Sequence, residues 1–378
     1  MRRFPRRGGT VNFPAPRDGL RLVNASVVSK LVISIDAMGG DHGPSVVVPG
    51  VALACKRMQD QDIRFLLHGD GTKLEAELKR SPAAACICDI RHTDTVVAMD
   101  EKPAQALRRS KGTSLWNAVE AIRAGEAQAA VSAGNTGALM AISKLILRMA
   151  GGLDRPAIVA SWPTTRGVTA VLDVGANIDS EAEQLVEFAI MGAAFHHAVH
   201  GSTRPTVGIL NVGAEDMKGH QEVRDAHQIL RGAEFDFDYR GFVEGDDIAK
   251  GTVDVVVTDG FTGNVALKTA EGMARFFSTL MKDALTSNMQ SKLGALIAYP
   301  ALRAMRNRID PRSVNGGPLL GLNGIVVKSH GGTDAKGFAN AVHVAADMAR
   351  SDYAQEIARN MGRLSSALEK PLQPAAAS

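Results

Sequence analysis

Six clusters of glycine, asparagine and aspartate each follow a short apolar run, and they hold the residue types best suited to chemistry in this chain. They span residues 36–41, 133–137, 173–177, 211–216, 259–264 and 330–334. Glycine lets the backbone approach a ligand closely, and the free N–H groups at the start of a following helix favour an anion. Repeated six times, this arrangement suits phosphate. The residues that we expect to bind phosphate or substrate are Asp36, Gly39, Gly40, Asp41, Ser132, Asn135, Thr136, Gly137, Asp173, Asn177, Asn211, Asp259, Thr262, Gly263, His330 and Gly331.

Any one of these clusters also has an ordinary structural interpretation. A glycine or asparagine after a strand is good turn and helix-capping chemistry. Six of them in one chain favour a functional role. None is a Walker A loop and none matches GxGxxG, so the sequence does not indicate a tightly held nucleotide.

The elements that must position these clusters alternate between strand and helix. From Leu31 onward a short β-rich run gives way to a polar cluster and then to a segment with helical periodicity. That order predicts an α/β fold, a doubly wound and mostly parallel sheet in an α/β/α sandwich. In a parallel sheet the carboxyl ends of the strands share one edge. We therefore expect all six clusters to meet at one edge, which would be the active site.

A helical hairpin is predicted to protrude from the sheet over about 265–310. Apolar residues recur at i, i+3 and i+4 spacing from 266 to 285, and a second apolar stretch over 293–305 is interrupted by Pro300. One interpretation is a dimer-forming arm or core packing. The other is a membrane-surface contact through Leu293, Leu296 and Ile297, with basic neighbours meeting anionic lipid. Both can hold in one dimer.

Composition excludes several classes of protein. Aromatic residues make up 4% of the chain and no basic stripe interleaves with them, so nucleic-acid binding is not expected. No apolar run approaches the ~20 residues of a spanning helix, which predicts a soluble, intracellular protein.

Residues 30–364 are predicted to form a single α/β domain. Residues 1–29 read as a disordered basic extension, with a mitochondrial-style presequence as the alternative, and 365–378 read as a disordered tail.

No metal or other cofactor is indicated. The spacing of Cys86 and Cys88 is too tight for a CxxC pair, and His196, His197 and His200 have no acidic or sulfur partner at ligand spacing in the sequence. Aspartates near a phosphate site leave Mg²⁺ open as an alternative.

The clusters together resemble the bacterial phosphate acyltransferase family of phospholipid synthesis. The segments that carry the resemblance are 35–42, 132–140, 173–177, 211–216 and 256–265, and the likeness runs from about Leu31 to about Ala358. The family usually starts near Leu31, so the first 29 residues depart from its pattern. Together the motifs are highly specific, whereas any single one is not.

The resemblance implies reversible transfer of a long acyl chain from acyl carrier protein to inorganic phosphate. It further implies a homodimer with a fold like the phosphotransacetylases and isopropylmalate dehydrogenases, in the cytoplasm with peripheral membrane contact. The acyl phosphate would supply a membrane acyltransferase that acts on glycerol 3-phosphate. In this family a lysine of the Asn-Val-Gly-x-Glu-Asp loop and the asparagine of the Thr-Gly-Asn turn are tied to catalysis, and these positions fall on Lys218 and Asn264.

We hypothesise that Lys218 neutralises the incoming phosphate and that the side-chain amide of Asn264, or nearby backbone N–H groups, holds the developing oxyanion. Spacing alone favours a helix N-cap for Asn264 and a solvated surface lysine for Lys218, and the family resemblance reverses that preference. The rival functions are a phosphotransacetylase that uses acyl-CoA, a dehydrogenase of the isopropylmalate type, and a non-catalytic membrane-docking scaffold.

Overall fold

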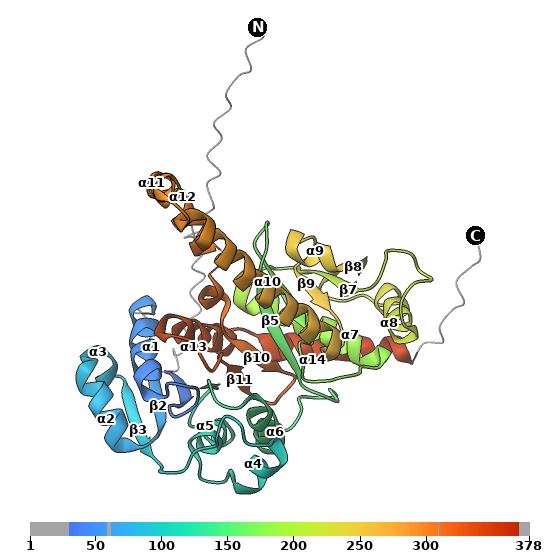
Figure 1. Cartoon of the computed structure of the whole chain (residues 1–378). Helices are drawn as coiled ribbons and strands as arrows, with labels where there is room; N and C mark the ends of the chain where they lie inside the picture. The colour runs from blue at the N-terminus through green and yellow to red at the C-terminus, as the bar shows by residue number, and fades with distance from the viewer. Residues whose placement is uncertain (1–29, 59–61, 309, 370–378) are drawn as a thin grey trace.

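An eleven-stranded sheet with helices on both faces forms the body of the protein (Figure 1). The computed structural model describes residues 30–58, 62–308 and 310–369. The strands are β1 Leu31–Asp36, β2 Ile63–Gly69, β3 Cys88–His92, β4 Ala129–Ser132, β5 Ala157–Pro163, β6 Val168–Leu172, β7 Thr206–Leu210, β8 Asp238–Val243, β9 Val255–Val257, β10 Gly317–Leu320 and β11 Ile325–Lys328. The helices are α1 Pro44–Arg57, α2 Gly71–Arg80, α3 Pro82–Ala85, α4 Pro103–Arg109, α5 Ser114–Arg123, α6 Thr136–Leu147, α7 Ala182–His200, α8 Gln221–Gly232, α9 Gly245–Lys250, α10 Gly260–Thr286, α11 Met289–Ile297, α12 Tyr299–Arg308, α13 Ala335–Arg350 and α14 Tyr353–Leu368. The predicted α/β class with a large, mostly parallel sheet is confirmed.

The sheet consists of two parallel halves that run in opposite directions. Its strand order is β3-β2-β1-β4-β11-β10-β5-β6-β9-β7-β8. Strands β3, β2, β1, β4 and β11 are parallel to one another, and so are β6, β9, β7 and β8. Between the halves, the pairings β11–β10, β10–β5 and β5–β6 are all antiparallel. Three reversals leave the second half antiparallel to the first.

This reversal corrects the prediction that all six polar clusters meet at one edge. The carboxyl ends of β1, β4 and β11 lie at one edge of the sheet, which we call the first edge. The carboxyl ends of β6, β9 and β7 lie at the opposite edge, which we call the second edge. The connection between β5 and β6 is only four residues long, far too short for the crossover that a parallel pair needs, so these two strands form an antiparallel hairpin.

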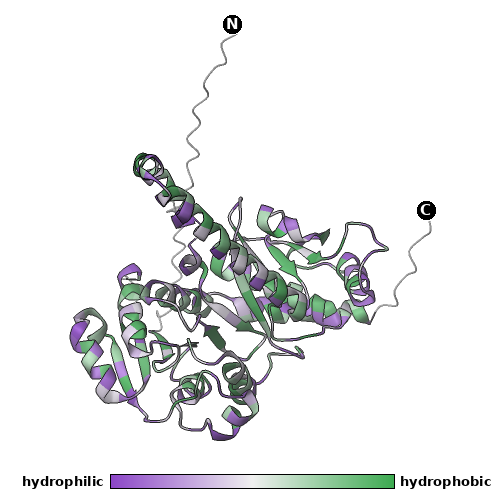
Figure 2. Ribbon diagram, viewed as in Figure 1, coloured by the Kyte–Doolittle hydropathy of each residue, from purple (hydrophilic) through white to green (hydrophobic). Residues whose placement is uncertain are grey.

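The central strands are largely apolar because helices cover both faces of the sheet, as Figure 2 shows, whereas the edge strands β3 and β8 carry charged residues. Helices α1, α7, α13 and α14 pack on one face, and α5 and α6 pack on the other face of the first half. Helix α7 lies so close to the sheet that a Cβ on Gly192 would come within 2.6 Å of Val255 and 2.7 Å of Leu172. This contact fixes β6 and β9 beneath α7, and these two strands lead directly into the second edge.

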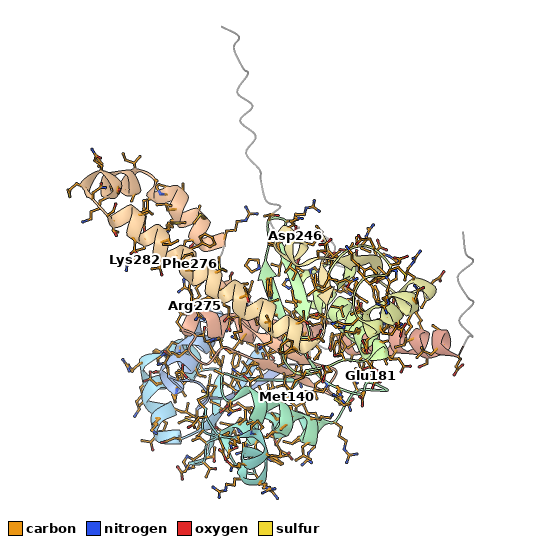
Figure 3. The ribbon with its side chains drawn as sticks, turned by 45° about the vertical axis from the view of Figure 1, so that its right-hand side comes forward. Met140, Glu181, Asp246, Arg275, Phe276 and Lys282 are labelled. Carbon is orange, nitrogen blue, oxygen red and sulfur yellow. The ribbon has the colours of Figure 1, made fainter. Side chains whose placement is uncertain are left out.

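Helices α10, α11 and α12 form an arm that leaves the body, so the predicted protruding helical hairpin is confirmed (Figure 1). Figure 3 labels Arg275, Phe276 and Lys282 on the part of α10 that extends outward. Phe276 is 53% exposed and Leu296 is 71% exposed. Core packing within this chain was therefore a wrong interpretation of the apolar pattern of the arm.

The ends of the predicted domain need one adjustment. Helix α14 continues to Leu368 and buries Leu364, so residues 365–368 are helical where a disordered tail was predicted. The remainder of that tail, 370–378, and the predicted extension 1–29 lie outside the described residues. No helix in the described part of the chain is long and apolar enough to cross a membrane.

Candidate functional site

Asp173, which directly follows β6, shapes the loop at the second edge. The residue is fully buried, and its carboxylate accepts N–H groups from Ile158 at 2.9 Å, Ala176 at 3.0 Å and Asn177 at 2.6 Å. Burial raises the pKa of Asp173, and these N–H donors oppose that rise by stabilising the charged form. Both carboxylate oxygens are used within the protein. Asp173 thus holds the loop and the neighbouring strand β5 in place, where the sequence had suggested a ligand contact.

Asn177 has a similar internal role. Its side-chain Nδ2 donates to the Pro156 carbonyl at 2.9 Å and to Asp173 Oδ2 at 3.0 Å. Asn177 is only 6% exposed. These hydrogen bonds therefore hold the loop after β6 in place, and Gly175 is its solvent-exposed part.

Helix α10 begins in contact with the loop after β6, and two glycines make this close approach possible. A Cβ on Gly260 would lie 2.2 Å from the Asn177 carbonyl oxygen, and one on Gly263 would lie 1.9 Å from the Asp173 carbonyl oxygen. Asp259 caps the helix by accepting the Thr262 N–H at 2.8 Å and the Thr262 hydroxyl at 2.7 Å. Since Asp259 is the N-cap, the alternative interpretation of Asn264 as a plain N-cap is wrong.

Asn264 lies in the second turn of α10 with its side chain over the β6 loop. Its side-chain oxygen would be 3.6 Å from a Cβ built on Gly175. Asn264 is exposed, and no hydrogen bond of its amide group is found within the described chain. This amide is therefore free to donate to a ligand close to the positive end of a helix.

Lys218 lies in the loop after β7, the strand that pairs with β9. Asn211 closes this loop, since its Nδ2 donates to the Lys218 carbonyl at 3.2 Å. Lys218 Nζ is 2.8 Å from Glu215 Oε1, and the lysine side chain is 49% exposed. The hydrogen bond to Glu215 raises the pKa of Lys218, so the ammonium group stays charged at neutral pH. Lys218 is thus a solvent-accessible lysine in an ion pair with Glu215, and its role in catalysis stays a prediction.

The structure therefore brings Lys218 and Asn264 to the same edge, because the strands that precede them, β7 and β9, are neighbours and lie about 4.8 Å apart. The predicted residues that share the second edge with them are Asp173, Asn177, Asn211, Asp259, Thr262 and Gly263. The remaining predicted residues, Asp36, Gly39, Gly40, Asp41, Ser132, Asn135, Thr136, Gly137, His330 and Gly331, gather at the first edge.

At the first edge three loops pack directly on one another. Ser132 donates its hydroxyl to Asp36 Oδ2 at 2.7 Å, and the Asp41 N–H donates to the Gly331 carbonyl at 3.0 Å. Asn135 caps α6 by accepting the Ala138 N–H at 3.0 Å. Asp36 is 2% exposed, and burial raises its pKa. Ser132, Asn135 and Asp36 Oδ2 thus stabilise the loops, whereas Asp36 Oδ1 has no hydrogen-bond partner among the described residues.

Lys328, the last residue of β11, is a first-edge residue that sequence reasoning missed. In the sheet register Lys328 lies opposite Ser132, which lies opposite Asp36. Its Nζ donates to the Ala133 carbonyl at 3.3 Å. Burial lowers the pKa of Lys328 to about 8, although Asp36 and Asp41 favour its charged form. The signal was available, since Lys328 is the one charged residue of an otherwise apolar strand.

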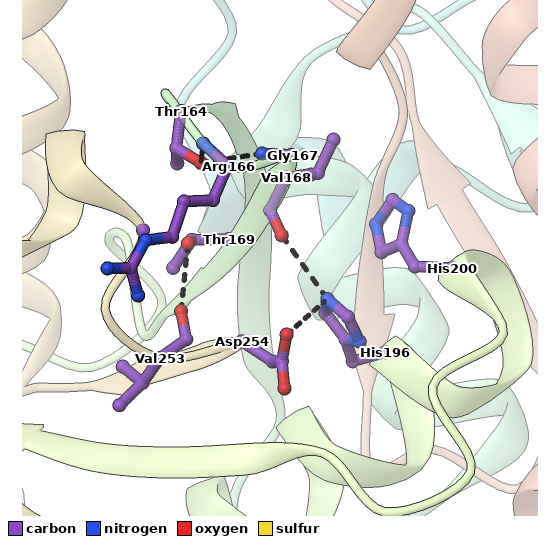
Figure 4. A pocket seen from close by; sticks show the side chains of 10 residues that line it. Thr164, Arg166, Gly167, Val168, Thr169, His196, His200, Val253 and Asp254 are labelled. Atoms are coloured by element: carbon purple, nitrogen blue, oxygen red, sulfur yellow. Dashed lines mark hydrogen bonds and ion pairs between the residues drawn. The ribbon is translucent and has the colours of Figure 1, made fainter. Parts of the chain in front are cut away.

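A cavity of about 310 Å³ lies at the amino ends of β6 and β9 (Figure 4). Neither Lys218 nor Asn264 lines it. Arg166, His196, His200 and Asp254 are among its lining residues. His196 Nε2 is 3.3 Å from the Val168 carbonyl and 4.0 Å from Asp254 Oδ1, and burial lowers the pKa of His196. None of the residues that line this cavity belongs to the six predicted clusters.

One group of side chains in the described residues has the composition of a metal site. Ligand atoms of His197, Asp352 and Glu356 lie within 4.8 Å of one another, where α7 ends and α14 begins. His197 Nδ1 is already 2.7 Å from Glu356 Oε2, which is a hydrogen-bonding distance and closer than two ligands of one ion are usually placed. The expectation that the protein needs no metal stays a prediction.

Comparison with known proteins supports the family that the sequence motifs resemble. A family model described as "Fatty acid synthesis protein" matches residues 31–356. The phosphate acyltransferase of Caulobacter vibrioides is 70% identical over 334 residues, covering 88% of this chain and 92% of that protein. The phosphate acyltransferase of Phenylobacterium zucineum is 61% identical over 351 residues, covering 93% and 99%.

Solved structures agree on the fold. The EutD phosphotransacetylase of Staphylococcus aureus superposes with a TM-score of 0.55 at 15% identity, covering 85% of this chain and 95% of that one. A phosphotransacetylase of Streptococcus pyogenes gives a TM-score of 0.56 at 17% identity, covering 85% and 94%. At this level of identity the likeness concerns the fold alone.

Proposed function

The chain belongs to the fatty acid synthesis protein family and is a phosphate acyltransferase, and from this premise we propose that its acyl donor is a long-chain thioester of acyl carrier protein. The phosphate oxygen forms a bond to the acyl carbon, the carbon–sulfur bond breaks, and the carrier thiolate leaves and takes up a proton. The products are acyl phosphate and free carrier protein, and the reaction runs in both directions. The acyl phosphate supplies a membrane enzyme that acylates glycerol 3-phosphate. Because the chain is an enzyme, the scaffold alternative is wrong.

One observation supports this assignment of the site most strongly. A charged lysine and an uncommitted asparagine amide lie at the carboxyl ends of two adjacent strands, next to the start of α10. Phosphate is already substantially ionised at neutral pH, so attack on a thioester needs positioning and charge compensation more than it needs a strong base. Lys218 supplies the positive charge for phosphate. The amide of Asn264 stabilises the oxyanion that forms on the acyl carbonyl.

Phosphate-dependent release of free carrier protein from palmitoyl carrier protein tests the proposed donor. Palmitoyl-CoA is assayed in parallel under the same conditions. Faster turnover with the carrier-protein thioester is expected. If only the CoA thioester reacts, the enzyme is of the phosphotransacetylase type and the proposed donor is wrong.

Lys218→Met is expected to raise the KM for phosphate about tenfold with a smaller change in kcat, because it removes a charge that meets phosphate before the reaction. Initial rates over a range of phosphate concentrations measure both constants. Lys250→Met is the matched control: Lys250 pairs with Asp246 at 2.6 Å, is similarly exposed and lies on α9. An unchanged KM in the Lys218 variant would remove Lys218 from the phosphate site.

We propose that the arm makes the homodimer contact and that its tip, through Leu293, Leu296 and Ile297, reaches the membrane surface. The tip residues are 61%, 71% and 76% exposed, and Lys292 and Arg303 lie nearby in the sequence. Leu296→Glu is expected to lower the fraction of protein that floats with anionic vesicles severalfold. Flotation equal to that of the parent protein would contradict the membrane contact, and sedimentation velocity reports separately on the dimer.

A further inference from the structure

The second edge carries a set of exposed apolar side chains that the proposed catalytic pair does not explain. We call this set the apolar rim, and its members are Ile178, Val212, Met217, Phe261 and Val265. Their exposed fractions are 73%, 75%, 87%, 64% and 50%. Elsewhere on the described surface outside the arm, the exposed large apolar side chains range from 39% for Leu53 to 55% for Leu145. Four of the five rim residues are therefore more exposed than any other large apolar side chain on the described surface outside the arm.

The members of the apolar rim come from two loops and the first turns of α10, which the sheet brings to one edge. Ile178 follows β6, Phe261 and Val265 follow β9, and Val212 and Met217 follow β7, and these strands are neighbours in the order β6-β9-β7. Ile178 and Phe261 are held close together, because Asn177 and Gly260, the residues beside them, are in direct contact. Exposed apolar groups gathered in this way mark a binding surface.

Polar groups lie within the apolar rim. Lys218 follows Met217 directly, and Asn264 precedes Val265. A ligand that covers the rim must therefore have an apolar part next to a polar, reactive end. A fatty acyl thioester has this construction, since its carbonyl carbon must reach Lys218 and Asn264 while its chain remains attached.

We propose that the apolar rim binds the acyl chain of the donor and so gives the enzyme its preference for long chains, an inference that rests on the proposed function. A second copy of this chain is a less fitting occupant. A permanent contact with a second copy over the rim would also cover Lys218 and Asn264, which the donor thioester must reach. The arm offers a separate apolar surface for dimer formation.

The test compares chain lengths in Ile178→Gln, Met217→Gln and the control Leu145→Gln. Leu145 lies on α6 and is 55% exposed, so the control makes the same kind of change outside the rim. Each rim variant is expected to lower kcat/KM for palmitoyl carrier protein about tenfold and to change that for butyryl carrier protein less than twofold. The control should change neither value.

Binding without phosphate gives a readout that does not depend on turnover. Fluorescence anisotropy of labelled palmitoyl and butyryl carrier protein should show tighter binding of the long chain in the parent protein and in the control, and the rim variants should lose that difference. If the carrier-protein donor is wrong, the binding of palmitoyl-CoA and butyryl-CoA is measured instead, by competition with a fluorescent acyl probe. A chain-length preference with the CoA thioesters that the rim variants lose would support the rim and still reject the carrier-protein donor. Equal effects on both chain lengths, or a rim variant that becomes monomeric, would overturn the assignment of the rim to the acyl chain.

Discussion

Replacing Asn264 with alanine is expected to lower kcat for acyl transfer to phosphate about a hundredfold while the protein stays folded. The loss of one well-placed oxyanion donor typically costs ~3 kcal/mol of transition-state stabilisation. Asn264 is exposed and is not the N-cap of α10, so its removal should leave the helix start intact. Steady-state kinetics with saturating donor and phosphate measures kcat, and circular dichroism confirms the fold.

Gln290→Ala provides the matched control, because it removes an exposed side-chain amide from α11, away from the second edge. Its kcat should equal that of the parent protein. If Asn264→Ala turned over at a near-normal rate, the oxyanion role would pass to backbone N–H groups of the α10 start. If Asn264→Ala instead lowered the melting temperature so far that the protein was unfolded at the assay temperature, the loss of activity would indicate a structural role.

Asp173→Ala is expected to lower the free energy of unfolding by about 3–5 kcal/mol, the largest effect on stability that we foresee at the second edge. The substitution leaves the N–H groups of Ile158, Ala176 and Asn177 without their buried acceptor. Chemical denaturation followed by circular dichroism measures the change. Asp173→Asn should be milder than Asp173→Ala, because the amide oxygen still accepts some of these hydrogen bonds.

An exposed aspartate tests whether the effect depends on burial. Asp246 pairs with Lys250 on the surface, and its side chain is 69% exposed, so Asp246→Ala should change the stability by no more than about 0.5 kcal/mol. Similar losses in the two variants would mean that the carboxylate of Asp173 does not organise the loop.

Much of the architecture could be predicted from local patterns. The apolar runs before Asp36, Asp173 and Asp259 are strands, and helices follow them. The periodicity after Asn264 is a long helix. These features depend on residues close together in the chain, which is why the sequence reveals them.

The relative direction of the two halves could not be predicted in the same way. It depends on pairings such as Leu319 with Ile158, which are distant in the sequence. The short connection over residues 164–167 was the available signal for the β5–β6 hairpin. The role of Asp173 was similarly hidden, because an aspartate in a glycine-containing loop looks the same in a sequence whether it accepts backbone N–H groups or faces a ligand.

Helix α10 runs unbroken over 27 residues from the turn that holds Asn264 to the far end of the arm, a length of about 40 Å. Its base is clamped where Gly260 and Gly263 touch the β6 loop, whereas no residue beyond Gly263 in this helix is fully buried. The fixed base of α10 therefore lies beside Asn264. A small change in the tilt of the helix at its base would displace the outer end of the arm by a much larger distance, and a force on that outer end would be transmitted along the helix to the residues around Asn264.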